Sequence, residues 1–276
     1  MKEFRNIRYK RIETRDLFMD IFLPEESNPP LIMWIHGGGW NELNRTWNLA
    51  MPMLERGYAI ASVDYRYSDE GPFPSQMLDL KDALLFLKKY ASRYGYDGGR
   101  IAVSGDSAGG HLSALLGVST GNQDWEGVEG DYSVQAVVDM CGPTNLSLTF
   151  KGLEEKDNPT TELLGAPVSS KAGLARAAVA SPLTYINGSE PPFLILHGSE
   201  DPVVFPEQSR LLRNALEKAG VPVMMYLIPG AVHAFEGRLV TEIMVEFLDY
   251  FLKGIKTVET PEVQKCHYRV IPYTKK

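Results

Sequence analysis

The chain has few cysteines, no long apolar run and no excess of positive charge. Its two cysteines, Cys141 and Cys266, are far apart in the 276 residues, and neither has the spacing typical of a metal site. We therefore expect free thiols, no disulfide scaffold, no metal ion and no other cofactor.

No apolar stretch approaches the ~20 residues that span a bilayer. The first sixteen residues are polar and basic without an apolar core, so no signal peptide is visible. The expected location is cytoplasmic, or secreted or periplasmic if a leader has been removed.

The overall charge and composition narrow the class of protein further. With 28 basic and 35 acidic residues the net charge is −7, which gives no basic surface for nucleic acid, and we expect no membrane partner. An apolar fraction of 44% and a charged fraction of 23% are typical of a globular protein with a sizeable core. No repeat or Gly-, Ser- or Pro-rich linker divides the chain. We therefore expect one domain over residues 1–276.

Short buried strands alternate with amphipathic helices along most of the sequence. The N-terminus predicts an antiparallel strand pair (7–12 and 17–23), and buried strands are expected at 31–35, 58–63, 101–104, 134–140, 193–196 and 223–227. Helical spacing is found at 47–56, 76–94, 207–219 and 240–252, and a further helix begins at Ser107. This alternation predicts an α/β fold with a mostly parallel sheet covered by helices on both faces. In such sheets, ligands bind beyond the carboxyl ends of the strands.

Two segments do not fit this alternation. Residues 142–181 are too long for an ordinary loop and are predicted to form a small cap insertion with one helix near 172–179. The segment 256–276 is a C-terminal tail in which 268–271 forms either a late strand or part of an irregular end. The tail leaves oligomerisation open.

The leading candidate for a nucleophile is Ser107, in the pentapeptide Gly105-Asp106-Ser107-Ala108-Gly109. This Gly-x-Ser-x-Gly pattern directly follows a predicted strand and opens a helix. Such a sharp turn crowds the backbone, so both flanking glycines are required and the serine hydroxyl is presented at the edge of the sheet. The pattern alone is common, and its interpretation depends on the partners found elsewhere in the chain.

A base and an acid follow Ser107 in the order that this arrangement needs. His233 lies in a loop just past a buried strand and is the predicted general base and acid. Asp201 follows the preceding strand by a few residues and is the predicted orienting carboxylate, with Glu200 as its rival. We expect His197 and His111 to be structural, and His267 lies in the tail.

The sequence His36-Gly37-Gly38-Gly39-Trp40 follows the strand at 31–35. Consecutive glycines let backbone N–H groups approach a substrate, so the amides of Gly38 and Gly39, with that of Ala108, are predicted to form an oxyanion hole. His36 is expected to hold this loop. Among the aromatic residues, Trp40 and Phe205 are the predicted substrate contacts, whereas Trp47, Tyr65 and Trp125 have less favourable positions.

Several motifs together resemble a known family. His-Gly-Gly-Gly-Trp at 36–40, Val-Asp-Tyr-Arg-Tyr at 63–67 and Gly-Asp-Ser-Ala-Gly-Gly-His at 105–111 resemble the hormone-sensitive-lipase-like branch of α/β-hydrolase esterases. The segments 197–204 and 229–235 are more similar to the bacterial carbohydrate esterases of this group. The resemblance covers roughly residues 25–252, with a valine at 232 where a glycine is usual. It implies the α/β-hydrolase fold and activity on acetyl-xylan or feruloyl esters.

These observations lead to one main hypothesis and two alternatives. The main hypothesis is a serine carboxylesterase for short-chain or carbohydrate-linked (acetyl or feruloyl) esters, whose partner is a small-molecule or oligosaccharide ester. A cap of about 40 residues without a long apolar helix pair argues against lipase action on long-chain lipids. An aryl-formamidase or other amidase would use the same residues. A non-catalytic α/β-hydrolase that acts by binding usually lacks one member of the triad, whereas this chain has all three.

Overall fold

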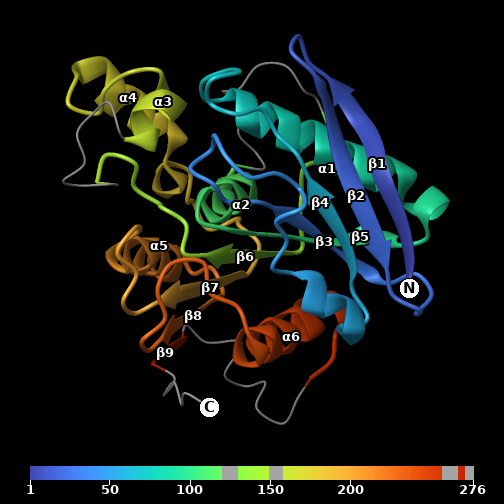
Figure 1. The fold of residues 1–276 in the computed structure, drawn as a ribbon. Coiled ribbons are helices and arrows are strands. Elements are labelled where there is room, and N and C mark those ends of the chain that lie inside the picture. Colours follow the sequence, from blue (N-terminus) through green and yellow to red (C-terminus); the bar gives the residue numbers. More distant parts are fainter. Residues whose placement is uncertain (120–129, 149–157, 257–266, 271–276) are drawn as a thin grey trace.

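The computed structural model describes residues 1–119, 130–148, 158–256 and 267–270 (Figure 1). At its centre is a nine-stranded sheet in the order β1-β2-β4-β3-β5-β6-β7-β8-β9. The strands are β1 (Lys2–Arg11), β2 (Asp16–Leu23), β3 (Pro30–Ile35), β4 (Ala59–Val63), β5 (Asp97–Asp106), β6 (Ala136–Met140), β7 (Phe193–Gly198), β8 (Val223–Ile228) and β9 (His267–Val270). The β1–β2 and β2–β4 pairs are antiparallel, and the pairs from β4 to β9 are parallel.

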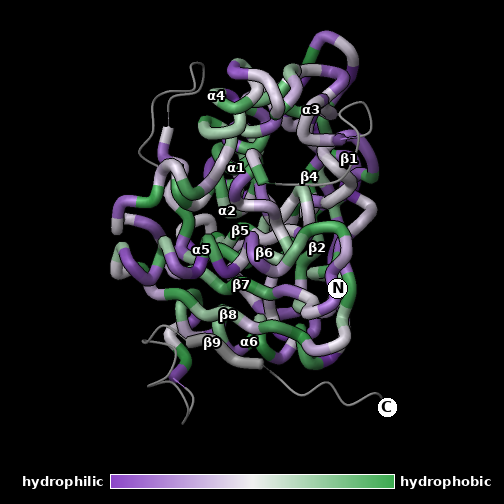
Figure 2. The backbone as a smooth tube through the Cα atoms, turned by 90° about the vertical axis from the view of Figure 1, so that its left-hand side faces the viewer, coloured by the Kyte–Doolittle hydropathy of each residue, from purple (hydrophilic) through white to green (hydrophobic). Residues whose placement is uncertain are grey.

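Helices cover both faces of this sheet. One face packs against α1 (Ser75–Tyr94), α2 (Ala108–Val118) and α5 (Glu207–Lys218), and the other against the short 3-10 helix η1 (Met51–Arg56) and α6 (Arg238–Lys253). The inner strands are largely apolar because alternate side chains enter the two cores: Leu31 and Met33 of β3 enter one, and Ile32 and Trp34 the other. Figure 2 shows this apolar character along the central strands. The predicted α/β architecture is confirmed.

The described residues of the insertion between β6 and β7 include two α-helices, where one was predicted. The expected helix is α4 (Lys171–Ala180), followed by the 3-10 turn η3 (Pro182–Thr184). The additional helix is α3 (Pro159–Leu164), which begins at a proline and is capped by Asn158, whose side chain accepts a hydrogen bond from the Thr160 amide. Six residues are too few to give a recognisable helical period. Residues 149–157 of the insertion lie outside the described residues, as does Trp125.

Two other expectations are settled by the backbone. The helical spacing at 47–56 yields only η1, because the side chains of Asn44 and Asn48 accept hydrogen bonds from nearby amides and Pro52 has no N–H to donate. In the tail, residues 267–270 form a strand, β9, whose backbone pairs parallel with β8. Within the described residues, no helix is long and apolar enough to cross a membrane.

Candidate active site

Ser107 lies at the apex of a strained turn between β5 and α2. Its backbone has φ 54° and ψ −118°, a conformation that residues other than glycine rarely adopt. The turn needs glycine on both sides: a Cβ atom at Gly105 would lie 2.4 Å from the Ile35 carbonyl oxygen, and one at Gly109 would lie 2.0 Å from the same atom. The Ser107 amide donates to the Met140 carbonyl at 2.8 Å, which fixes the turn to β6.

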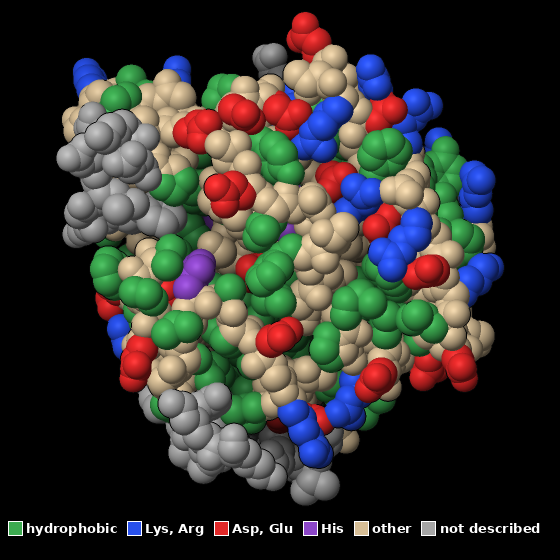
Figure 3. Space-filling model, viewed as in Figure 1, with side chains coloured by type: hydrophobic (Ala, Val, Ile, Leu, Met, Phe, Trp, Pro, Cys, Tyr) green, Lys and Arg blue, Asp and Glu red, His purple; other side chains and the backbone are tan. Residues whose placement is uncertain are grey.

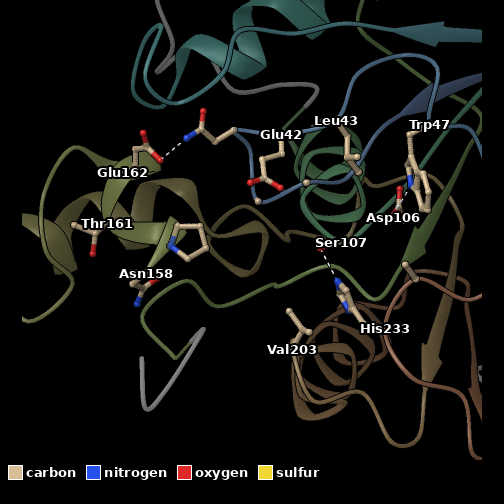
Figure 4. Close-up of a pocket in the computed structure, with 15 residues that line it drawn as sticks. Glu42, Leu43, Trp47, Asp106, Ser107, Asn158, Thr161, Glu162, Val203 and His233 are labelled. Carbon is tan, nitrogen blue, oxygen red and sulfur yellow. Dashed lines mark hydrogen bonds between the residues drawn. The ribbon is translucent and has the colours of Figure 1, made fainter. Parts of the chain in front are cut away.

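The side chains of Ser107, His233 and Asp201 form a continuous line of hydrogen bonds. The Ser107 hydroxyl lies 2.8 Å from His233 Nε2 (Figure 4). On the other side of the ring, His233 Nδ1 lies 2.7 Å from Asp201 Oδ2. A carboxylate only accepts, so the ring proton is assigned to Nδ1, which leaves Nε2 free to accept the serine proton. The three side chains come from loops after β5, β7 and β8, and β7 and β8 are neighbours, as the sequence prediction required.

The loop that carries Asp201 is held from several directions. Asp201 Oδ1 accepts the amides of Val203 and Val204 at 2.9 and 3.0 Å, and the buried His197 bridges Ser209 Oγ and the Val204 carbonyl. Burial alone would raise the pKa of Asp201, but hydrogen bonds from His197 and His233 lower it strongly, so the carboxylate stays charged. Its rival Glu200 is exposed on the same loop. His197 therefore has the structural position that was expected.

The glycine loop after β3 lies beside Ser107. Gly38 and Gly39 have φ of 95° and 57°, and both line the same cavity as Ser107. Among the described residues, neither their N–H groups nor that of Ala108, the first residue of α2, has a hydrogen-bond acceptor. The loop is fixed to the nucleophile turn by the Gly37 amide, which donates to Asp106 Oδ1 at 3.1 Å.

His36 holds the base of this loop, as predicted. Its ring is stacked on Tyr65 at 4.3 Å, and its Nδ1 lies 2.8 Å from the Gly37 carbonyl oxygen. Burial lowers the pKa of His36 to about 4, so the ring is neutral at neutral pH. The hydroxyl of Tyr65 donates to the His36 carbonyl at 2.9 Å.

A cavity of about 780 Å³ opens at Ser107 between the glycine loop and the cap. Trp47 and Asp106 lie on one side of Ser107, and Asn158, Thr161 and Glu162 of the cap lie on the other (Figure 4). Among the described residues, the lining carries three carboxylates, those of Glu42, Asp106 and Glu162, and no lysine or arginine. On the face seen in Figure 3, acidic side chains gather above a surface histidine and hydrophobic ones lie beside and below it.

The structure does not place the two predicted aromatic contacts in the lining of this cavity. Trp40 is fully buried, because its positive φ of 64° turns the side chain inward and its Nε1–H donates to His111 Nδ1 at 3.1 Å. His111 in turn contacts the Ala180 carbonyl through Nε2, which makes it structural as expected. Phe205 is 49% exposed on the loop after β7.

Trp47, which was ranked below Trp40 and Phe205 as a predicted substrate contact, does line the cavity. Trp47 donates from Nε1 to Asp106 Oδ2 at 3.1 Å, and burial raises the pKa of Asp106. Its only signal in the sequence was proximity to the glycine loop. The cap residue Glu162 also lay in an unassigned stretch; it accepts a hydrogen bond from Asn41 Nδ2 at 2.8 Å and so joins α3 to the glycine loop.

The sequence gives no signal for a role of Cys141 beyond that of a free thiol. This buried free cysteine directly follows β6, and its sulfur, an Asp201 oxygen and a His233 ring nitrogen all lie within 4.8 Å of one another. Cys141 belongs to no motif. Only the neighbouring positions of β6, β7 and β8 in the sheet bring it to these two residues.

The parallel sheet, the strained serine turn and the aligned Ser–His–Asp side chains define this protein as an α/β-hydrolase. More particularly, the chain belongs to the BD-FAE family, whose model matches residues 19–216. The match includes Ser107 and Asp201 and ends before His233.

Curated relatives and solved structures of similar sequence are named as esterases. Esterase LipQ from Mycobacterium tuberculosis is 31% identical over 85% of this chain and 59% of LipQ. The chain spans only about half to three fifths of the length of such relatives. A truncated carbohydrate esterase from gut microbiota is 28% identical with a TM-score of 0.82, covering 92% of this chain and 97% of that one. Esterase 2 of Thermogutta terrifontis is 25% identical with a TM-score of 0.71, covering 89% and 92%.

Proposed function

We propose that this chain is a serine carboxylic ester hydrolase that acts through an acyl-enzyme. The observation that carries the proposal is the hydrogen-bonded line from Ser107 through His233 to Asp201, which begins in the wall of a cavity. Three such side chains from three separate loops meet in the geometry that nucleophilic catalysis requires. The names of the relatives and of the solved structures agree with this activity.

In this mechanism His233 Nε2 takes the Ser107 proton while the oxygen attacks the ester carbonyl. The developing oxyanion is stabilised in this mechanism by the amides of Gly38, Gly39 and Ala108, since fixed backbone N–H groups can donate to it at little reorganisation cost. Asp201 keeps the ring proton on Nδ1 and stabilises the imidazolium that forms. His233 then protonates the leaving alcohol, and a water activated by the same nitrogen hydrolyses the acyl-enzyme. The continuous line of hydrogen bonds argues against a non-catalytic binding role.

We propose further that the substrates are short-chain or carbohydrate-linked esters, with acetyl or feruloyl as the acyl group. The two sides of the cavity support this. Trp47 and Leu43 offer apolar surface on one side of Ser107, whereas Asn158, Thr161 and Glu162 offer polar groups suited to sugar hydroxyls on the other. In the part of the cap that the structure describes, the helices α3 and α4 are both short, which gives little apolar surface for a long acyl chain.

Ser107→Ala tests the activity itself. The variant should lose hydrolysis of p-nitrophenyl acetate by about 10⁴-fold or more, because no nucleophile remains. The wild-type enzyme should be labelled once per chain by diethyl p-nitrophenyl phosphate, and the variant should not be labelled. Circular dichroism serves as the control for folding. Retained hydrolysis, or equal labelling of both proteins, would contradict the proposal.

A substrate panel tests the finer assignment. It compares acetylated xylan, feruloylated oligosaccharides, aryl esters from acetate to palmitate, and N-formylaniline. We expect the rate to fall steeply beyond butyrate and a sugar ester to exceed its aryl counterpart in kcat/KM. Preference for the palmitate would contradict the short-chain assignment, and preference for N-formylaniline would favour the formamidase alternative.

A further inference from the structure

We propose that Cys141, Asp201 and His233 form an inhibitory site for a thiophilic divalent cation such as Zn²⁺. The three donors stand at the carboxyl ends of adjacent strands, β6, β7 and β8, and their ligand atoms all lie within 4.8 Å of one another. Zinc binds sulfur at ~2.3 Å and nitrogen or oxygen at ~2.1 Å, so tetrahedral ligands lie about 3.3–3.7 Å apart. Shifts of about an ångström would therefore bring the three atoms onto one ion, with a fourth position left for water.

The kind of donors decides which cation the site would take. A thiolate and an imidazole prefer zinc or cadmium, whereas magnesium and calcium prefer sets made of oxygen atoms. The surroundings are also negative, because the carboxylates of Asp201 and Asp106 both act on the sulfur. Burial and these two charges raise the pKa of the Cys141 thiol, while hydrogen bonds from the backbone of Ala234 and Ser107 to the sulfur favour the thiolate. A bound cation would offset the burial and the negative charge together.

Metal binding at this position would act on the proton that the proposed mechanism uses. In the free enzyme the ring proton of His233 is on Nδ1 and Nε2 accepts from Ser107. A cation on Nδ1 takes the place of that proton, which moves to Nε2, and the thiol proton of Cys141 is released to water. The ring then presents an N–H to Ser107 and has no lone pair left to accept the serine proton. The enzyme would be switched off with its substrate cavity open.

Access to the site passes through the imidazole. Cys141 is fully buried and Asp201 is 3% exposed, whereas His233 lines the cavity. The ring must turn before an ion can reach Nδ1 and the sulfur. We therefore expect inhibition that develops over time and is reversed by a chelator, in contrast to rapid competition at the cavity mouth.

Direct binding is measured first, because the site does not depend on the proposed function. Cadmium titration should give the ultraviolet charge-transfer absorption of one cadmium–thiolate bond, and equilibrium dialysis should give one Zn²⁺ per chain. Cys141→Ala should lose the absorption and weaken Zn²⁺ binding by roughly 100-fold or more, since even an outer hydrogen-bonding partner is worth 10–100-fold. Cys141→Ser, which is nearly isosteric, serves where the alanine variant fails to fold. Cys266→Ser, which removes the other cysteine of the chain, should bind as the wild type does.

The inhibition rests on the esterase function proposed above, and it is measured separately. Each protein is incubated with Zn²⁺, Mg²⁺ or EDTA, and its rate is compared with its own untreated rate. We expect slow, EDTA-reversible inhibition by Zn²⁺ in the wild type and Cys266→Ser proteins, its loss in both Cys141 variants, and no inhibition by Mg²⁺. Equal inhibition of all variants, or a cadmium–thiolate band that persists in Cys141→Ala, would overturn the proposal. Metal binding by a protein without esterase activity would instead contradict the proposed function alone.

Discussion

Replacing Asp201 by asparagine perturbs the proposed mechanism with the least change of shape. Asp201 uses both oxygens: Oδ1 accepts the amides of Val203 and Val204, and Oδ2 accepts the ring N–H of His233. An asparagine has one oxygen and one NH₂ group. Two backbone donors hold the oxygen at the first position, so the NH₂ group must face His233 Nδ1.

That arrangement forces the ring proton of His233 onto Nε2, so Nε2 can no longer accept the proton of the Ser107 hydroxyl. The expected loss in kcat is about 10⁴-fold, which corresponds to ~5.4 kcal/mol at 1.36 kcal/mol for each factor of ten. Substrate binding involves neither oxygen of Asp201, so KM should change little.

The assay is steady-state hydrolysis of p-nitrophenyl acetate, with the rate of organophosphate labelling of Ser107 as a second measure of its activation. Glu200→Gln is the matched control: Glu200 is the adjacent carboxylate, is exposed, and should change kcat by less than about twofold. A loss in Asp201→Asn below tenfold, or an equal loss in Glu200→Gln, would refute the reasoning.

Three further perturbations test the loop, the cavity and the fold. Gly38→Ala should lower kcat by about 10²–10³-fold, because the added Cβ would lie 2.2 Å from the Glu42 carbonyl oxygen and displace an oxyanion donor. Gly220→Ala is the kinetic control, since Gly220 also has a positive φ but has open space around it. Replacing Glu42 and Glu162 together by glutamine should raise kcat/KM for an anionic ester, such as a p-nitrophenyl hemisuccinate, by about tenfold, since each exposed charge contributes ~1 kcal/mol or less. The kcat/KM for p-nitrophenyl acetate should not change, and equal effects on both esters would contradict a charge effect. Burial would raise the pKa of Glu70, but hydrogen bonds from Arg15, Tyr67 and Thr14 lower it to about 2, so Glu70→Gln should reduce the free energy of unfolding by ~2–3 kcal/mol at pH 7. Because the folded pKa lies below the ordinary value of 4.5, urea titrations should show this difference shrinking as the pH falls from about 4.5 towards 2, and a difference independent of pH would contradict it.

The central sheet and the Ser–His–Asp line were predictable because their signals are local. The inner strands are short and mostly apolar, and glycine is required at 105 and 109 because a Cβ atom at either position would lie too close to the Ile35 carbonyl oxygen. The loop positions of His233 and Asp201 then follow from the rule that parallel strands end at one edge of the sheet. Catalytic roles for these residues stay predictions until the variants are measured.

The lining of the cavity was not predictable in the same way. Trp40 is adjacent to the glycine loop in sequence, but one positive φ value turns it into the core, whereas Trp47 further along reaches the cavity. No periodicity or motif encodes the direction of a side chain in an irregular loop. Cys141 shows the same limit, since its position beside His233 depends on the order of strands in the sheet.

The distance along the chain between Ser107 and His233 has a consequence for biosynthesis. Their hydrogen bond joins residues 126 positions apart. At ~5–20 residues per second, the ribosome makes His233 about 6–25 s after the serine turn. During that interval the nascent chain carries Ser107 without His233, its proposed base, so the proposed hydrolysis could not occur. If the proposed function holds, turnover of a chromogenic ester would therefore report that translation has passed His233.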